Sequence, residues 1–123
     1  YNELYKALQG VINAGYRPIL AHIERYYCLY RNMSEIRQLR ELGVALQINT
    51  DSVMAKLSSE ASFCRKLIKE GYIHFFGSDC HRLNWRPPLM KSAVDTLRKK
   101  ISDDILDKIL YTNPYILKEN SFL

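Results

Sequence analysis

The feature that most constrains the fold is a unit that occurs three times: a helical segment, a glycine and a short apolar run. The helical segments end at Gly15, Gly43 and Gly71, and glycine suits a helix C-terminus because it accepts left-handed backbone. The apolar runs follow at residues 18–21, 44–48 and 73–76. Strands that are apolar throughout and alternate with helices belong in a parallel sheet covered on both faces, or in a barrel. We therefore predict an α/β fold with parallel strands.

The remaining helices follow from apolar periodicity and from capping residues. Helices are predicted over residues 2–14, 35–42, 61–70, 89–100 and 103–110. Ser34 is expected to cap the second helix, and Ser102 or Asp103 the last. Pro87 and Pro88 suit the first turn of the fourth helix, and 113–114 (Asn-Pro) is expected to begin a closing turn.

Composition limits the class of protein. The chain has 123 residues, enough for one hydrophobic core, and its 47% hydrophobic and 25% charged residues are typical of a globular domain. No apolar run approaches the ~20 residues that a bilayer-spanning helix needs, so we expect no membrane span. Three cysteines, an odd number without paired spacing, argue against a disulfide framework and favour a reducing, cytoplasmic setting.

The net charge of +5 raises the question of a nucleic-acid partner. The basic residues are spread over several predicted helices, and the densest cluster, at 98–100, has Asp95 and Asp103 nearby. Such a distribution is typical of solvated helix faces rather than of a nucleic-acid interface. We therefore expect no nucleic-acid partner.

Polar side chains follow each predicted strand. The first strand leads into His22, Glu24 and Arg25, the second into residues 49–51 (Asn-Thr-Asp), and the third into residues 78–81 (Ser-Asp-Cys-His). In parallel α/β folds, reactive groups gather just past the carboxyl ends of the strands. These three clusters are therefore expected to meet on one edge of the sheet.

Asp79 and His81 are the strongest candidate metal ligands. In extended backbone, residues two apart leave on the same face, and a carboxylate with an imidazole suits Zn, Mn or Fe. An isolated Asp-x-His is more often a turn residue and a surface residue, but His22 on the same edge favours the metal interpretation. His74 lies within an apolar run and is expected in the core rather than at the metal.

Two arginines follow the strand ends that carry these ligands. Arg25 and Arg86 have the positions to clamp phosphate oxygens, although ion pairs of an arginine with Glu24 or Asp79 fit the sequence as well. Cys80 and Arg86 also have the Cys-x5-Arg spacing of cysteine-dependent phosphatases. The loop between them is bulky and lacks the glycine that converging backbone amides need, so we reject a cysteine mechanism.

Four segments can be compared with known motifs: 21–26 (Ala-His-Ile-Glu-Arg-Tyr), 46–49 (Leu-Gln-Ile-Asn), 74–81 (His-Phe-Phe-Gly-Ser-Asp-Cys-His) and 86–88 (Arg-Pro-Pro). They resemble the AHPERY, LQIN, HFIASDAH and RPP segments of the bacterial capsular-polysaccharide tyrosine phosphatases, which belong to the polymerase-and-histidinol-phosphatase (PHP) superfamily of metal-dependent phosphoesterases. The ending at 113–117 also fits. The resemblance covers nearly the whole chain in the same order.

The resemblance implies a distorted PHP-type barrel that holds divalent metal ions, with manganese as the first choice and zinc or iron as alternatives. By position, His22, Asp79 and His81 match metal ligands, and Arg25 and Arg86 match the arginines that hold phosphate and assist catalysis. The implied reaction is metal-dependent hydrolysis of phosphotyrosine on a bacterial tyrosine kinase that controls capsule or exopolysaccharide export. No ligand role is carried onto Glu24.

Two departures and one gap accompany the resemblance. Ile23 replaces a proline and Cys80 replaces an alanine. The family's His-x-His pair and other N-terminal ligands have no match here, and three helix–strand units are about half of the ~250 residues of a closed barrel. We therefore expect residues 1–123 to be the C-terminal half of one domain, inactive alone and prone to self-association. Another PHP activity, such as histidinol-phosphate hydrolysis, and a non-catalytic phosphate-binding or assembly module remain as alternatives.

Overall fold

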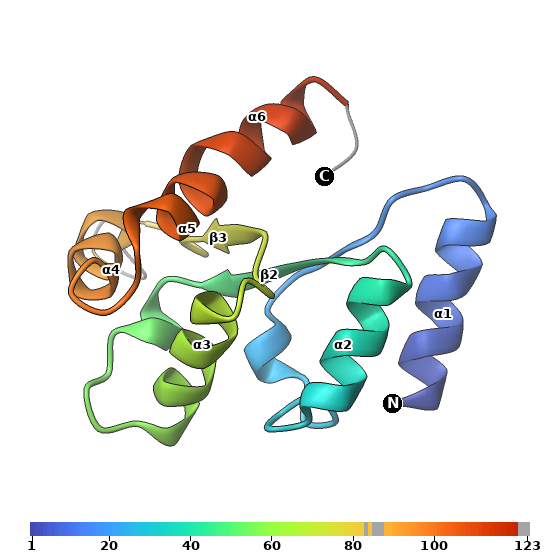
Figure 1. Ribbon diagram of the computed structural model, residues 1–123, viewed down its shortest axis with the longest axis horizontal. Coiled ribbons are helices and arrows are strands. Elements are labelled where there is room, and N and C mark those ends of the chain that lie inside the picture. Colours follow the sequence, from blue (N-terminus) through green and yellow to red (C-terminus); the bar gives the residue numbers. More distant parts are fainter. Residues whose placement is uncertain (83, 85–87, 121–123) are drawn as a thin grey trace.

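The computed structural model describes residues 1–82, 84 and 88–120. Its sheet has three parallel strands in the order β1 (Ile19–Leu20), β2 (Ala45–Asn49) and β3 (Phe75–Gly77). Ile19 pairs with Ala45, and Gln47 pairs with Phe75. The predicted α/β class with parallel strands is confirmed (Figure 1).

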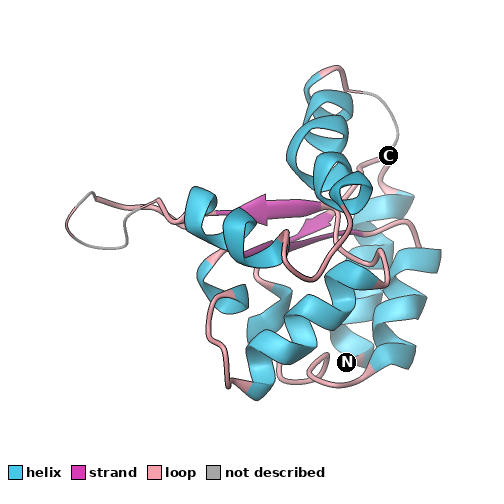
Figure 2. Ribbon diagram, turned by 60° about the vertical axis from the view of Figure 1, so that its left-hand side comes forward, coloured by secondary structure: helices cyan, strands magenta, loops and turns pink. Residues whose placement is uncertain are grey.

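Helices cover the sheet on both sides. They are α1 (Asn2–Asn13), α2 (Met33–Glu41), α3 (Ser59–Lys69), α4 (Met90–Leu97), α5 (Asp103–Asp107) and α6 (Asn113–Lys118). The views in Figures 1 and 2 place α1, α2 and α3 on one side and α5 with α6 on the other. Short 3₁₀ turns follow two strands, η1 (Ile23–Arg25) after β1 and η2 (Asp51–Val53) after β2. Within the described ranges, no helix is long and apolar enough to cross a membrane.

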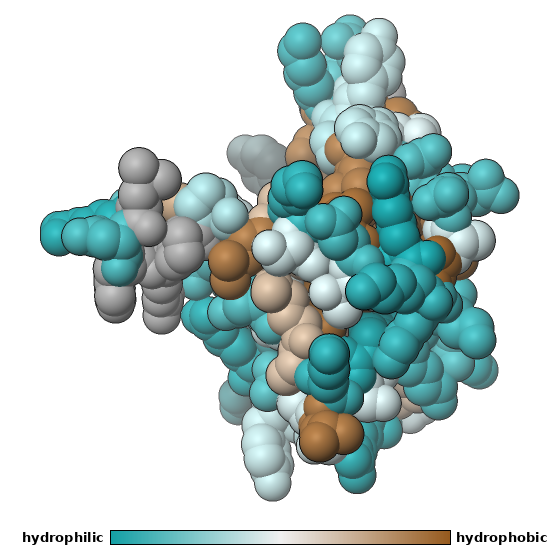
Figure 3. All heavy atoms as spheres, turned by 90° about the vertical axis from the view of Figure 1, so that its left-hand side faces the viewer, coloured by the Kyte–Doolittle hydropathy of each residue, from teal (hydrophilic) through white to brown (hydrophobic). Residues whose placement is uncertain are grey.

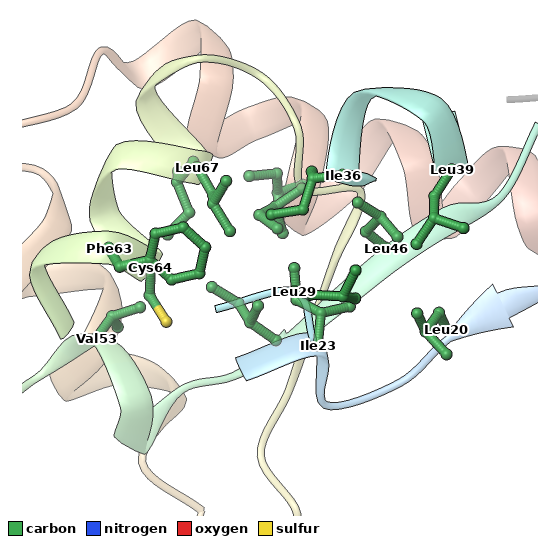
Figure 4. Packing of buried hydrophobic residues seen from close by; sticks show 14 of the residues in the cluster. Leu20, Ile23, Leu29, Ile36, Leu39, Leu46, Val53, Phe63, Cys64 and Leu67 are labelled. Carbon is green, nitrogen blue, oxygen red and sulfur yellow. The ribbon is translucent and has the colours of Figure 1, made fainter. Parts of the chain in front are cut away.

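A large part of the core lies between the sheet and the helices α2 and α3. Leu46 and Ile48 of β2 are fully buried, as are Ile36 and Leu39 of α2 and Leu67 of α3. Figure 4 shows the labelled members of this set, Leu46, Ile36, Leu39 and Leu67, grouped with Leu29 and Ile23 from the segment after β1. Each such side chain stabilises the fold by about 1.5–3 kcal/mol relative to exposure. This packing holds the ends of β1 and β2 in fixed positions.

Helix starts differ from the prediction at two places. Ser34 is not the cap of α2: the helix starts at Met33 after Asn32, and the Ser34 hydroxyl donates to side-chain oxygens of Asn32 and Glu35. A cap that was not predicted from the sequence is Ser58, whose hydroxyl accepts from the backbone N–H of Ala61 and starts α3.

The C-terminal turn predicted at 113–114 is wrong. A π-helical segment, η3 (Lys108–Thr112), joins α5 to α6, and α6 begins at Asn113 with Pro114 in its first turn. Proline is tolerated there because its missing N–H has no partner in the first turn of a helix. Pro88, by contrast, was predicted in the first turn of the fourth helix but lies outside it, because it precedes Leu89, the N-cap of α4. Pro87 lies outside the described residues.

Exposed large side chains include several tyrosines, such as Tyr16, Tyr27 and Tyr111. On the face drawn in Figure 3, hydrophobic residues emerge as separate patches among polar ones. Self-association of the chain therefore stays a prediction.

Candidate functional site

His22 leaves the end of β1 in an unusual conformation. Its φ of 55° and ψ of 47° lie in the left-handed region, which non-glycine residues seldom occupy. Its backbone N–H donates to Oε1 of Gln47 on β2 at 2.8 Å. Its buried ring atom Nδ1 has no hydrogen-bond partner among the residues that the structure describes. Oε1 of Glu24 lies 4.0 Å from this nitrogen.

Glu24 is a buried carboxylate beneath this histidine. Its side chain is only 1% exposed, and its Oε1 accepts from the backbone N–H of Asn49 at 3.4 Å. Its Oε2 is buried and lacks a hydrogen-bond partner in the described part of the chain. A buried carboxylate costs free energy unless positive or donor groups surround it. The environment of Glu24 and His22 therefore favours a cation close by.

Asp79 follows β3 and also has left-handed backbone, with a φ of 49°. The extended backbone predicted for the 79–81 segment is therefore wrong. Oδ2 of Asp79 lies 3.2 Å from Nη2 of Arg25 and accepts from Nδ2 of Asn49 at 3.4 Å. Of the two ion pairs that the sequence left open for Arg25, the structure contains the one with Asp79.

The ring of His81 is oriented by the residue two positions earlier. Its Nδ1 lies 2.7 Å from the carbonyl oxygen of Asp79 and 3.9 Å from Oδ1 of the same residue. A carbonyl oxygen only accepts, so Nδ1 carries a proton in this contact and donates it to the Asp79 carbonyl. Metal-ligating histidines are commonly held in this way, by a backbone carbonyl on the other ring nitrogen.

The structure thus brings Arg25, Asp79 and His81 together, whereas His22 lies against Glu24. In residues 1–82, 84 and 88–120, no group of three or more His, Cys, Asp or Glu side chains is close enough to hold a metal ion. The ligand roles of His22, Asp79 and His81 stay predictions. Arg86, the second predicted phosphate-binding residue, lies outside the described residues.

The donor set nevertheless fits a divalent metal. An imidazole and a carboxylate occur side by side at His81 and Asp79, and this combination suits Mn, Zn or Fe. Nδ1 of His22 and Oε2 of Glu24, which have no hydrogen-bond partner in the described part of the chain, are further polar atoms near the same strand ends that a metal and its surroundings would engage.

Two side chains on β2 belong to the site: Asn49 was expected at this edge without an assigned role, and Gln47 was not singled out from the sequence. Gln47 accepts from the His22 backbone, and the fully buried Asn49 contacts both Glu24 and Asp79. The sequence did contain a signal for both, because two polar residues two apart in an otherwise apolar strand point to the same face of the sheet. Cys80, by contrast, is exposed, and its N–H donates to the Ser78 hydroxyl.

His74 lies away from these strand ends, as predicted. It precedes β3, and its Nδ1 accepts from the backbone N–H of Leu46 at 3.0 Å. Burial, and to a smaller extent the charge of Arg40, lower the pKa of His74 to about 4. Its neutral ring therefore serves as a structural acceptor.

A cavity of about 580 Å³ also lies at the amino ends of the strands, where Pro18, Ala45 and His74 line it. Its two arginines already have protein partners: Arg40 donates to the Gly71 carbonyl and Arg17 to Asn120. The candidate catalytic groups cluster at the opposite, carboxyl ends of the strands, so the volume of this cavity does not mark it as the functional site.

The comparison with known proteins agrees with the sequence resemblance. A family model described as "Capsular polysaccharide synthesis, CpsB/CapC" matches residues 1–118. The chain belongs to this family. CpsB of Streptococcus pneumoniae, named a tyrosine-protein phosphatase, is 30% identical over 120 residues, which are 93% of this chain and 49% of that protein. YwqE of Bacillus subtilis, also named a tyrosine-protein phosphatase, is 31% identical over 89% of this chain and 40% of its own length.

The fold is shared with a solved relative. A chain from the crystal structures of YwqE of Bacillus subtilis and CpsB of Streptococcus pneumoniae, described as metal-dependent tyrosine phosphatases, superposes with a TM-score of 0.80 and 27% identity. The match covers 96% of this chain and 48% of that one. The chain thus spans about half the length of the CpsB/CapC relatives it matches.

Proposed function

We propose that this chain is part of a metal-dependent protein-tyrosine phosphatase that regulates capsular or exopolysaccharide synthesis. The observation that carries the proposal is the cluster at the end of β3, where His81 and Asp79 adjoin and the Arg25 guanidinium lies 3.2 Å from the Asp79 carboxylate. A metal-ligand pair with an arginine beside it suits a phosphate monoester, whose oxygens need positive charge on several sides.

Each residue has a distinct role in this proposal. Asp79, His81 through Nε2, and His22 would hold a divalent metal, of which manganese is the first choice. When bound, the metal stabilises charge on the phosphate and makes water a nucleophile at neutral pH. Arg25, whose side chain is 53% exposed, is accessible to the phosphate oxygens of a substrate and would orient them for attack. Arg86 would provide a second guanidinium.

We further propose that residues 1–123 form the C-terminal half of one PHP-type domain. The coverage of about half of each relative supports this, as does the scarcity of grouped metal ligands among the described residues. Further ligands would then come from an N-terminal half, so the chain alone would be nearly inactive. Among the described residues, the outer edges of β1 and β3 pair with no further strand, and this would favour self-association of the chain when it is separated from that half.

The proposed substrate is a phosphorylated tyrosine segment of a bacterial tyrosine kinase in the cytoplasm. The names of the relatives support a protein phosphotyrosine substrate. The exposed position of Arg25 and His81 supports it as well, because a phosphotyrosine on a protein must reach the metal from outside.

The experiment compares the full-length protein with the isolated 123-residue chain on a tyrosine phosphopeptide and on histidinol phosphate. We expect the full-length protein to hydrolyse the phosphopeptide faster than histidinol phosphate, to lose this activity with a chelator and to regain it with Mn²⁺. We expect the isolated chain to be at least about a hundredfold slower, because it would lack ligands. Equal rates would contradict the half-domain proposal.

Two further outcomes decide against the proposed activity. Faster hydrolysis of histidinol phosphate would favour another phosphoesterase activity of the same superfamily. A full-length protein that contains no Mn, Zn or Fe by elemental analysis, and gains none on incubation, would instead favour a non-catalytic phosphate-binding module.

A further inference from the structure

Each of the two outer strands of the sheet is followed, two residues after its end, by a residue with left-handed backbone. These residues are His22, with a φ of 55°, and Asp79, with a φ of 49°. Side chains other than glycine occupy this region at a cost in free energy, and they do so when the surrounding structure holds them there. The central strand, β2, supplies the groups that hold both.

A chain of three hydrogen bonds crosses the sheet from one of these residues to the other. The His22 N–H donates to Oε1 of Gln47 at 2.8 Å. Nε2 of Gln47 donates to Oδ1 of Asn49 at 3.2 Å. Nδ2 of Asn49 then donates to Oδ2 of Asp79 at 3.4 Å. We call Gln47 and Asn49 the amide relay.

The direction of the amide relay is fixed at both ends. The His22 end presents an N–H, which needs an acceptor, and the Asp79 end presents a carboxylate, which needs a donor. Turning either amide over would place two donors or two acceptors face to face. Each amide therefore has one orientation, and that orientation depends on its neighbour.

The packing around the amide relay also restricts it. Asn49 is fully buried and Gln47 is 9% exposed. Gly77 on β3 lies against the Gln47 side chain so closely that a Cβ there would collide with Nε2. Nε2 of Gln47 also donates to the carbonyl of Ile48 at 2.6 Å, a further contact that holds the amide in place. The amide relay is thus a buried and closely packed connection between the two strand ends.

We propose that Gln47 and Asn49 are positioning residues that couple His22 to Asp79 and hold both in the geometry for binding metal. This inference deepens the proposed function, on which its metal-binding part depends. Neither residue needs to contact substrate. The role of the amide relay is to fix the position of the His22 backbone relative to that of the Asp79 carboxylate.

Two isosteric substitutions test the amide relay in the full-length protein. Asn49→Asp removes the donor to Asp79. Gln47→Glu keeps the acceptor for His22 but removes the donor to Asn49, so Asn49 is expected to turn its amide over and present an oxygen to Asp79. Gln47→Glu should therefore disturb Asp79, which the amide relay links to position 47 through Asn49.

The Mn²⁺ affinity of these variants distinguishes a positioning role of the amide relay from a simple effect of charge, because the two predict opposite changes. Both substitutions add a negative charge near the metal, which by Coulomb attraction alone would tighten binding of Mn²⁺. Loss of positioning instead weakens binding by about 10–100-fold, as for other groups that orient metal ligands. Titration of each variant with Mn²⁺, followed by electron paramagnetic resonance, distinguishes the two. Unchanged or tighter binding in either variant would overturn the proposal.

A second measurement needs no metal. The ¹³C resonance of the Asp79 carboxyl group, observed in the metal-free protein, should move in Gln47→Glu as it does in Asn49→Asp. Gln9→Glu is the matched control, because Gln9 is exposed on α1 and the substitution adds the same charge. An Asp79 resonance that moves in Asn49→Asp but not in Gln47→Glu would refute the coupling.

The two measurements separate the amide relay from the proposed function. If the Asp79 resonance responds to Gln47→Glu while the wild-type protein binds no Mn²⁺, the coupling stands and the metal-dependent function fails. If the wild-type protein binds Mn²⁺ and both variants bind it equally well, the function stands and the positioning role is wrong.

Discussion

The guanidinium of Arg25 and the carboxylate of Asp79 lie 3.2 Å apart and join segments that follow β1 and β3, the two outer strands of the sheet. The pair is partly exposed, so its contribution to stability is small, about 0–1 kcal/mol. The ion pair matters more for the geometry of the site, because it places a predicted phosphate-binding group in contact with a predicted metal ligand.

Arg25→Lys in the full-length protein should lower kcat/KM for a tyrosine phosphopeptide by about a hundredfold. Lysine keeps the charge but lacks the planar fork that binds two phosphate oxygens at once. The thermal midpoint should change little, since the side chain is 53% exposed. Steady-state kinetics and thermal unfolding of the same preparation measure both quantities.

Arg31→Lys is the matched control for this substitution. Arg31 is near Arg25 in sequence, but its guanidinium lies over the Tyr30 ring at 5.4 Å rather than against Asp79. It should retain wild-type kinetics. Equal losses in the two variants would assign the effect to general charge or folding instead of phosphate binding.

Gly77→Ala should destabilise the protein by about 1–3 kcal/mol, as overpacking of a dense interior does. A Cβ at position 77 would collide with the Gln47 amide, and the neighbouring Asn49 leaves little room for that amide to move. The change is measured as a shift in the urea midpoint at constant m-value.

Gly10→Ala provides the opposite expectation in the same assay. Gly10 lies inside α1, and a Cβ there would have nothing within 4 Å. Alanine should stabilise the helix by about 0.5–1 kcal/mol. If Gly77→Ala were as stable as Gly10→Ala, the close approach of β3 to Gln47 would be wrong.

The parallel sheet was predictable because its signals are local. Each apolar run is preceded by a helix that ends at a glycine, and Gly15, Gly43 and Gly71 all have positive φ. The first run was predicted too long, since β1 contains only Ile19 and Leu20. An outer strand pairs on one side only, and apolar character alone does not say how far that pairing extends.

The site was only partly predictable because it depends on contacts between distant segments. Residues such as Asp79 and His81 were found from the rule that functional groups follow strand ends. The left-handed backbone at Asp79 leaves no mark in the sequence, since aspartate adopts it only occasionally. The link from Gln47 to Asn49 likewise requires knowing that both side chains face the ends of two other strands.

The cysteines should differ strongly in reactivity. Burial raises the pKa of the Cys64 thiol to about 12, with a smaller contribution from the charge of Glu24. Cys64 is fully buried in the core, whereas Cys80 is exposed. At pH 8, a thiol reagent followed by peptide mass spectrometry should modify Cys80 in the folded protein and Cys64 only after unfolding.

Cys80→Ala serves as the control, because it removes the exposed thiol and leaves the core intact. The fast phase of labelling should then disappear. Rapid modification of Cys64 in the folded variant would show that α3 opens readily, contrary to the dense packing around Phe63 and Leu67.

Stability should fall as the pH is lowered through the titration range of His74. Its pKa is about 4 in the folded protein, against an ordinary value of 6.5, so the unfolded chain binds a proton that the folded one does not. The stabilisation is therefore complete above pH 6.5, is lost as the pH falls toward 4, and changes no further below that. The full shift corresponds to about 3 kcal/mol, and partial exposure of the ring reduces this to about 1–2 kcal/mol.

Urea unfolding at pH 7.0 and at pH 5.5 measures the loss of stability within this window, at pH values where carboxylates titrate little. His74→Gln, whose amide can still accept from the Leu46 N–H but does not titrate, should lose much less stability between these two pH values. An equal loss in both proteins would mean that groups other than His74 control the acid sensitivity.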